Sequence, residues 1–191
     1  MVNQDNPTRI LILATPRRWK DDRQMVELST QRLTIKRLSG LDKARLIELI
    51  GDPRVSETLS NVPYPYTEKD AEYWIGIVHS SEFNFNIFHN GLLIGGIGLT
   101  PQRDDCCELG YWLGFEYWGR GYATEACHAL LEHASVVTCF RQVRANVYEG
   151  NSASSNVLEK VGFKQLGAGE VFSLSKQKNI PCHHYEYHLP D

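Results

Sequence analysis

Hydrophobic residues in several stretches of the chain alternate with polar ones, which is the period of a half-buried β-strand. Residues 33–35 show this alternation early in the chain, and residues 83–87 show it again. Asn90-Gly91 favours a tight turn, after which residues 92–99 return as a hairpin partner. Further strands are predicted at residues 108–113, 141–148 and 185–189.

Between these strands, apolar residues recur every three or four positions, as they do on one face of a helix. Asp42 can cap a helix over residues 42–50, and Thr67 with Asp70 forms a weak capping box for a second helix. Another helix is predicted over residues 151–162. One further helix, after the glycine loop at 119–121, carries these residues on one side: Ala123, Ala126, Cys127, Leu130, Leu131 and Ala134. Strands that alternate with helices predict a mixed α/β sheet with helices on both faces.

The first residues differ in composition from the rest of the chain. Residues 1–24 combine polar, structure-breaking residues with a run of mixed charge, which predicts a loosely held arm. Residues 25–191 then form the predicted domain, because 191 residues suit one domain with a full-sized core.

Charge and cysteine content narrow the class of protein. A net charge of −3 argues against nucleic acid or an anionic membrane as the main partner. The five cysteines contain no C-x-x-C pair, so we expect reduced thiols, a cytoplasmic location and no metal site. The longest early apolar run, residues 10–14, is too short for a signal segment or a membrane span.

A glycine-bearing loop joins the strand at 108–113 to the helix that follows. The segment is Trp118-Gly119-Arg120-Gly121-Tyr122-Ala123-Thr124-Glu125-Ala126. Such a loop directs backbone N–H groups at one point, and the helix dipole adds positive potential there, so a pyrophosphate would fit. Glycines also let a phosphate approach the backbone closely. The loop is neither a Walker A motif nor a full dinucleotide fingerprint.

The order of motifs resembles the GCN5-related N-acetyltransferase (GNAT) superfamily. The motifs are Thr30-Gln31-Arg32-Leu33, Glu108-x-Gly110-Tyr111, the loop at 118–126, and Asn151-x-x-Ser154 followed by Gly162-Phe163. The chain is most similar, from about Leu28 to its C-terminus, to the branch that acetylates the N-terminal alanine or serine of ribosomal proteins. Trp118 stands where many superfamily members carry Gln or Arg, but Trp is common in this branch.

The resemblance implies a fold and a cosubstrate site. The sheet would part between the strands at 108 and 141, leaving a V-shaped slot for acetyl-CoA. The backbone of Gly119, Arg120, Gly121, Tyr122, Ala123 and Thr124 would bind the pyrophosphate. The backbone of Trp112, Leu113 and Gly114 would bind the acetyl carbonyl and pantetheine, and Asn151 and Ser154 would lie beside the thiol.

Acetyl transfer to an amine requires a base, an oxyanion donor and an acid for the leaving thiolate. A thioester is already activated, so we expect direct attack in a ternary complex without a cysteine intermediate. Glu108 is the candidate base, against the alternative of a structural strand carboxylate. The backbone N–H near Leu113 is the candidate oxyanion donor. Ser154 is the candidate acid, against a simple helix cap, and Tyr185 and Tyr187 are rival acids.

The acceptor remains open at this level. The resemblance implies the N-terminal amine of a ribosomal protein. The alternatives are a small amine, such as a polyamine, an aminoglycoside or an amino acid, and a CoA-binding module without catalysis. In this family the region of Pro63-Tyr64-Pro65-Tyr66 shapes the acceptor pocket, although rigid packing would also explain it. A monomer and a homodimer are both compatible with the sequence.

Overall fold

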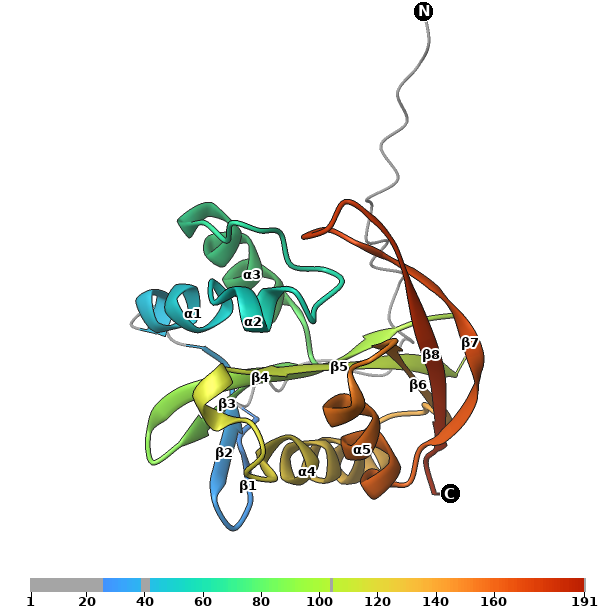
Figure 1. The fold of residues 1–191 in the computed structure, drawn as a ribbon. Helices are drawn as coiled ribbons and strands as arrows, with labels where there is room; N and C mark the ends of the chain where they lie inside the picture. Colours follow the sequence, from blue (N-terminus) through green and yellow to red (C-terminus); the bar gives the residue numbers. More distant parts are fainter. Residues whose placement is uncertain (1–25, 39–41, 104, 191) are drawn as a thin grey trace, which may run out of the picture.

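A computed structural model describes residues 26–38, 42–103 and 105–190. The strands among these residues form one sheet in the order β1-β2-β3-β4-β5-β6-β8-β7 (Figure 1). Their bounds are β1 Leu28–Ser29, β2 Leu33–Lys36, β3 Asn84–His89, β4 Leu92–Pro101, β5 Cys106–Leu113, β6 Gln142–Tyr148, β7 Lys164–Ser173 and β8 Lys178–His188. The predicted arm, residues 1–24, lies outside the described residues.

Helices cover both faces of the sheet, as predicted (Figure 1). α1 (Lys43–Ile50), α2 (Pro53–Ser56) and α3 (Glu68–Ser80) lie on one face. α4 (Tyr122–Val137) and α5 (Ser152–Val161) lie on the other, and a short 3-10 helix, η2 (Phe115–Tyr117), precedes α4. No helix among the described residues is long and apolar enough to cross a membrane.

Local signals in the sequence set several element ends. Thr67 and Asp70 form the predicted capping box at the start of α3. Asp42 is the residue before α1, but its side chain makes no capping hydrogen bond there. Gly162 ends α5 with a φ of 104°, a left-handed conformation that glycine adopts without steric cost.

Several parts of the architecture were not predicted. β7, at residues 164–173, was missed, and β8 begins at Lys178 rather than near residue 185. Residues 164–168 of β7 are all exposed, so this half of the strand carries no alternation of buried and exposed positions. α2 was also missed, because a single helical turn is too short to show a helical period.

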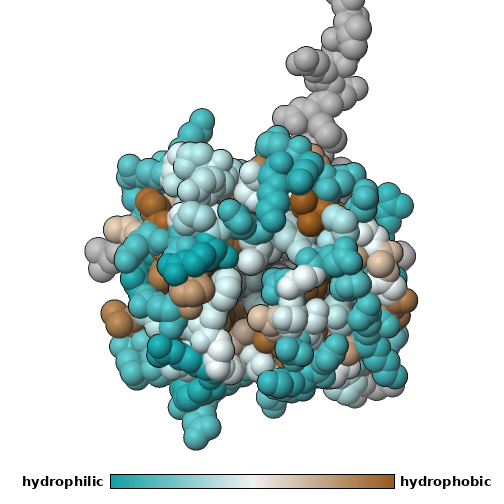
Figure 2. All heavy atoms as spheres, in the orientation of Figure 1, coloured by the Kyte–Doolittle hydropathy of each residue, from teal (hydrophilic) through white to brown (hydrophobic). Residues whose placement is uncertain are grey.

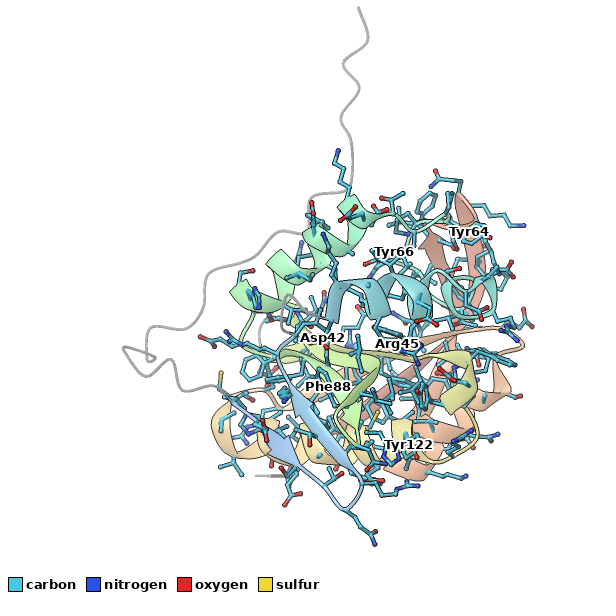
Figure 3. The ribbon with its side chains drawn as sticks, turned by 90° about the vertical axis from the view of Figure 1, so that its left-hand side faces the viewer. Asp42, Arg45, Tyr64, Tyr66, Phe88 and Tyr122 are labelled. Atoms are coloured by element: carbon cyan, nitrogen blue, oxygen red, sulfur yellow. The ribbon has the colours of Figure 1, made fainter. Side chains whose placement is uncertain are left out.

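The sheet separates two hydrophobic clusters. The larger packs α4 and α5 against the sheet through residues such as Leu109, Leu130, Leu158 and Tyr185. The smaller packs α1 to α3 over β3, β4 and the end of β5, and includes Phe88 and Trp112. Figure 3 shows Tyr66 and Tyr64 on the side of α1 to α3 and Tyr122 on the other.

The pairing of β5 with β6 stops early. These two strands run parallel and are in register only from Cys106 opposite Gln142 to Glu108 opposite Arg144, whereas all the other strand pairs in the sheet are antiparallel. Beyond Glu108 the strands diverge, which confirms the predicted V-shaped slot.

Candidate active site

The edge of β5 that borders the slot carries the predicted oxyanion donor. The Gly114 N–H donates to the Ile94 carbonyl on β4 at 2.9 Å. Neighbouring N–H groups of an extended strand point to opposite edges, so the Leu113 N–H faces the slot. The Leu113 carbonyl accepts a hydrogen bond from the Trp118 indole at 2.8 Å. Figure 2 shows the surface hollowed near the middle of this view, level with the sheet.

The glycine loop has the backbone geometry that the predicted pyrophosphate site requires. Gly119 and Gly121 have φ values of 71° and 78°, which strain any other residue. Gly121 is the residue before α4, and the first N–H groups of a helix have no acceptor within it. Tyr122 and Ala123 turn their side chains into the larger cluster, so their backbone forms the loop surface.

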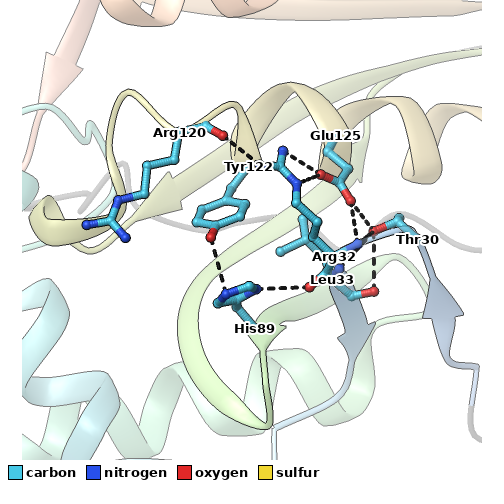
Figure 4. Close-up of polar contacts among 7 residues, drawn as sticks. All are labelled: Thr30, Arg32, Leu33, His89, Arg120, Tyr122 and Glu125. Atoms are coloured by element: carbon cyan, nitrogen blue, oxygen red, sulfur yellow. Dashed lines mark hydrogen bonds and ion pairs between the residues drawn. The ribbon is translucent and has the colours of Figure 1, made fainter.

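A cluster from the turn between β1 and β2 holds this loop in place (Figure 4). The Arg32 guanidinium donates to Glu125 at 2.6 Å and to the Arg120 carbonyl at 2.9 Å. Thr30 donates to the same carboxylate at 2.6 Å. Partial burial opposes ionisation of Glu125, but the bonds from Thr30 and Arg32 outweigh it and hold the pKa of Glu125 below its usual range. We call Thr30, Arg32 and Glu125 the loop clamp.

The remaining contacts in Figure 4 tie the clamp to β3. The His89 imidazole lies 3.0 Å from the Arg32 carbonyl and 3.2 Å from the Tyr122 hydroxyl. The Arg32 guanidinium also lies 4.7 Å from the centre of the Tyr122 ring. The first residue of α4 is therefore fixed by contacts from β2 and β3.

Glu108 lies where β5 and β6 begin to part. It shares a face of β5 with Trp112, which packs beneath the α1 to α3 layer. Its carboxylate accepts hydrogen bonds from Gln102 at 3.3 Å and from Asn146 at 3.0 Å. It is half-buried, and the Asn146 contact crosses from β6 to β5. The predicted base is thus a carboxylate held at the closed end of the slot, where β5 and β6 begin to part.

Ser154 lies on the opposite side of the sheet from Glu108. Its hydroxyl is 2.7 Å from the Tyr111 hydroxyl, and Tyr111 packs against the larger cluster. Its backbone N–H donates to the Asn151 side chain at 3.1 Å, so Asn151 caps α5. Tyr111 was quoted in the motif without a role, and the signal that could have found it is its alternation with Glu108 along β5. Burial raises the pKa of Tyr111 and keeps its proton in place.

The two rival acids pack in or against the larger cluster. Tyr185 is 1% exposed within the larger cluster. The Tyr187 ring lies 5.3 Å from that of Phe163.

Trp112 packs its side chain in the smaller cluster, and its indole nitrogen, like the Tyr148 hydroxyl, is buried without a hydrogen-bond partner among the described residues.

Two open pockets lie near the segments that the sequence singled out. One, of about 620 Å³, is formed by α1, α2 and Tyr66, and its lining includes none of the predicted catalytic residues. The other, of about 330 Å³, lies at the start of α5 and includes Asn151 and Tyr185. No three His, Cys, Asp or Glu side chains gather into a potential metal site within the described part of the chain.

Comparison with known proteins gives a consistent family. Residues 32–164 match the model of the acetyltransferase (GNAT) domain. The chain is 24% identical over 165 residues to "Uncharacterized N-acetyltransferase p20" of Bacillus licheniformis, covering 82% of this chain and 92% of that protein. A GNAT-family acetyltransferase from Bacillus anthracis superposes with a TM-score of 0.77 at 21% identity, over 87% of this chain and 100% of the other. RimL, a ribosomal L7/L12 alpha-N-protein acetyltransferase solved with coenzyme A, superposes with a TM-score of 0.73 at 15% identity, over 86% and 98%.

Proposed function

The chain belongs to the GNAT acetyltransferase family, and on that premise we propose that it transfers an acetyl group from acetyl-CoA to the N-terminal amine of a protein. One observation carries this proposal. Glu108 and Ser154 lie on opposite sides of the sheet at the point where β5 and β6 part. An amine can therefore approach from the Glu108 side while the thioester lies in the slot toward Ser154.

The glycine loop and the slot edge bind different parts of acetyl-CoA. The backbone from Gly119 to Thr124 holds the pyrophosphate, and the backbone from Trp112 to Gly114 lies along the pantetheine. The Leu113 N–H donates to the oxyanion, since it points into the slot. Asn151 acts here by fixing the first turn of α5, which positions Ser154.

The transfer is a direct attack. Glu108 takes a proton from the amine, and the amine nitrogen forms a bond to the thioester carbonyl carbon. The carbon–sulfur bond then breaks, and the thiolate takes a proton from Ser154, whose hydroxyl is paired with that of Tyr111. The Ser154 oxygen regains a proton from solvent, to which Glu108 releases the amine proton, so both groups return to their starting state. Atoms balance as an amide and free CoA, with no covalent enzyme intermediate.

The acceptor class rests on the family branch. The likeness to RimL supports a protein N-terminus, with the cytoplasm as the compartment, where free thiols such as the five of this chain persist. A small amine is the second candidate, because the Leu174 N–H in the β7–β8 hairpin donates to the Ser60 carbonyl at 2.8 Å. That contact joins the hairpin to the segment before α3, and we propose that it limits the acceptor side of the slot to smaller amines.

A thiol-release screen tests the proposal. Acetyl-CoA turnover would be measured with peptides that begin with Ala or Ser, and with polyamines, aminoglycosides and amino acids. N-terminally blocked forms of the same peptides are the matched controls. We expect CoA release with free peptide N-termini. Release only with small amines would replace the acceptor, and release with none would leave a binding module.

A further inference from the structure

Glu108 is connected through Asn146 to a histidine on β8. The Asn146 amide nitrogen donates to Glu108 at 3.0 Å, and its amide oxygen lies 2.6 Å from His184 Nδ1. An amide has one donor end and one acceptor end, so the His184 nitrogen must carry the proton in this arrangement. The two bonds therefore fix each other's direction.

The position of the His184 ring depends on a glycine on the edge strand. Asn146 and His184 are opposite each other in the β6–β8 register, so their side chains share one face of the sheet. A Cβ at Gly169 of β7 would lie 2.2 Å from His184 Nε2. A Cβ at Gly167, two residues earlier, would meet no atom within 4 Å. The His184 ring therefore occupies the space where a side chain at position 169, but not at position 167, would lie.

We infer that Asn146 and His184 are positioning residues that hold the Glu108 carboxylate in the orientation in which it accepts the amine proton, an inference that rests on the proposed function. Asn146 holds one carboxylate oxygen and Gln102 the other. His184 makes the amide of Asn146 present its nitrogen, rather than its oxygen, to Glu108. Without the His184 donor, a flipped amide would place an oxygen against the carboxylate.

Substitutions at position 184 separate this role from simple packing. His184→Ala removes the donor and should lower kcat about tenfold, with the KM for acetyl-CoA unchanged. His184→Asn places an amide nitrogen close to the position of Nδ1, and should restore kcat to within about threefold of the wild type. His184→Asp offers only an acceptor and should lower kcat at least as far as His184→Ala. His183→Ala is the control, since His183 pairs with Gln165 on the other face and should keep its kcat.

A second test asks whether His184 acts through its contacts with Gly169 and with the Glu108 site. Gly169→Ala should reproduce the loss caused by His184→Ala, whereas Gly167→Ala should not. In a Glu108→Gln background, His184→Ala should lower kcat by less than twofold, because residues that act as one unit are not additive. Full additivity, or a His184→Asn variant no better than His184→Ala, would overturn the inference.

A readout without turnover keeps the inference apart from the proposed function. Imidazole ¹⁵N shifts of the full chain should show the His184 proton on Nδ1, and in Asn146→Ala that preference should be lost. A proton on Nε2 in the wild type would overturn the inference even if every amine were acetylated. A wild type that turns over no amine, but shows the Nδ1 proton, would contradict the proposed function while confirming the hydrogen bonds that link His184, Asn146 and Glu108.

Discussion

Adjacent side chains of β5 serve opposite sides of the slot because a strand turns successive residues to opposite faces. Glu108 faces the proposed acceptor side, and Tyr111 faces the side where Ser154 lies. Glu108 and Tyr111 face opposite sides because one is at an even and the other at an odd position of β5, and Tyr111 holds Ser154 on its own side. A change at one of these residues should alter one proton transfer and leave the other in place.

Glu108→Gln tests the base. Glutamine keeps the shape and one acceptor oxygen but takes up no proton, so turnover should fall about 10²–10⁴-fold while acetyl-CoA affinity stays nearly constant. The acid limb of the pH–rate profile should move toward the pKa of the amine itself, because only neutral amine then attacks. Ser154→Ala is the matched variant and should leave that limb where it was. Turnover within about threefold of the wild type would return Glu108 to a structural role.

The paired cysteines before Glu108 should be inert. Cys107 is fully buried, and burial raises the pKa of its thiol to about 12; burial also raises the pKa of Cys106. The thiolate is therefore scarce at neutral pH. Intact mass after incubation with acetyl-CoA alone should show no added acetyl group. Replacing both cysteines by Ala should leave turnover largely intact, and a stable acetyl adduct would contradict direct transfer.

The sequence predicted some site residues and could not predict others. Glu108 and Gly121 lie inside continuous motifs, so their neighbours reveal their strand and loop. Asn146 and His184 carry no such signal, because they meet Glu108 only through strand pairing between distant segments. Alternation marks which face a side chain takes, but not which partner lies across the sheet.

At the scale of elements, the loop clamp connects β2 to the start of α4. Arg32 lies on the turn before β2, and Glu125 lies in the first turn of the helix. Local sequence signals explain several elements. The Thr67–Asp70 box and Asn151 predicted the starts of α3 and α5, and Asn90-Gly91 predicted the β3–β4 turn, where both residues have positive φ. β7 was missed because its stability comes from pairing with β8 rather than from burial of one face.

The clamp should matter for cosubstrate affinity more than for chemistry. Arg32→Ala frees the Arg120 carbonyl and the Glu125 carboxylate, so the Kd for acetyl-CoA should rise about five- to tenfold, equivalent to about 1–1.4 kcal/mol. Titration calorimetry would measure it. Lys36→Ala, which removes a cation from β2 at 3.9 Å from Glu27, is the control and should leave Kd unchanged.

The clamp should also weaken in acid. A carboxylate whose pKa is lowered by folding stabilises the native state above its unfolded pKa, and this contribution is lost as pH falls through the lower, folded value. The stability difference between the wild type and Glu125→Gln should therefore be largest near neutral pH. It should shrink as pH falls below about 4.5, the usual carboxyl value. A difference that grew in acid would rule out an ionised clamp.

For the whole molecule, acetyl-CoA should act as a stabiliser specific to this fold. At about a hundred times its Kd, a ligand that binds only the native state adds about 2.7 kcal/mol. In a chain of 191 residues this raises the melting temperature by about 5–10 °C. NAD and ATP at equal concentration should do much less. An equal shift with NAD would contradict the assignment of the glycine loop to CoA.

The early end of β5–β6 pairing gives the molecule a seam. Three residue pairs join these strands, against seven in the antiparallel pairing of β4 with β5. Beyond Glu108, the β5 amides that face the slot lack the partners that a continuous sheet would supply, so they should exchange with deuterium earlier than those that face β4. Bound acetyl-CoA would fill the seam and slow that exchange. The part of the sheet that opens most easily without ligand should therefore gain the most protection when the ligand binds.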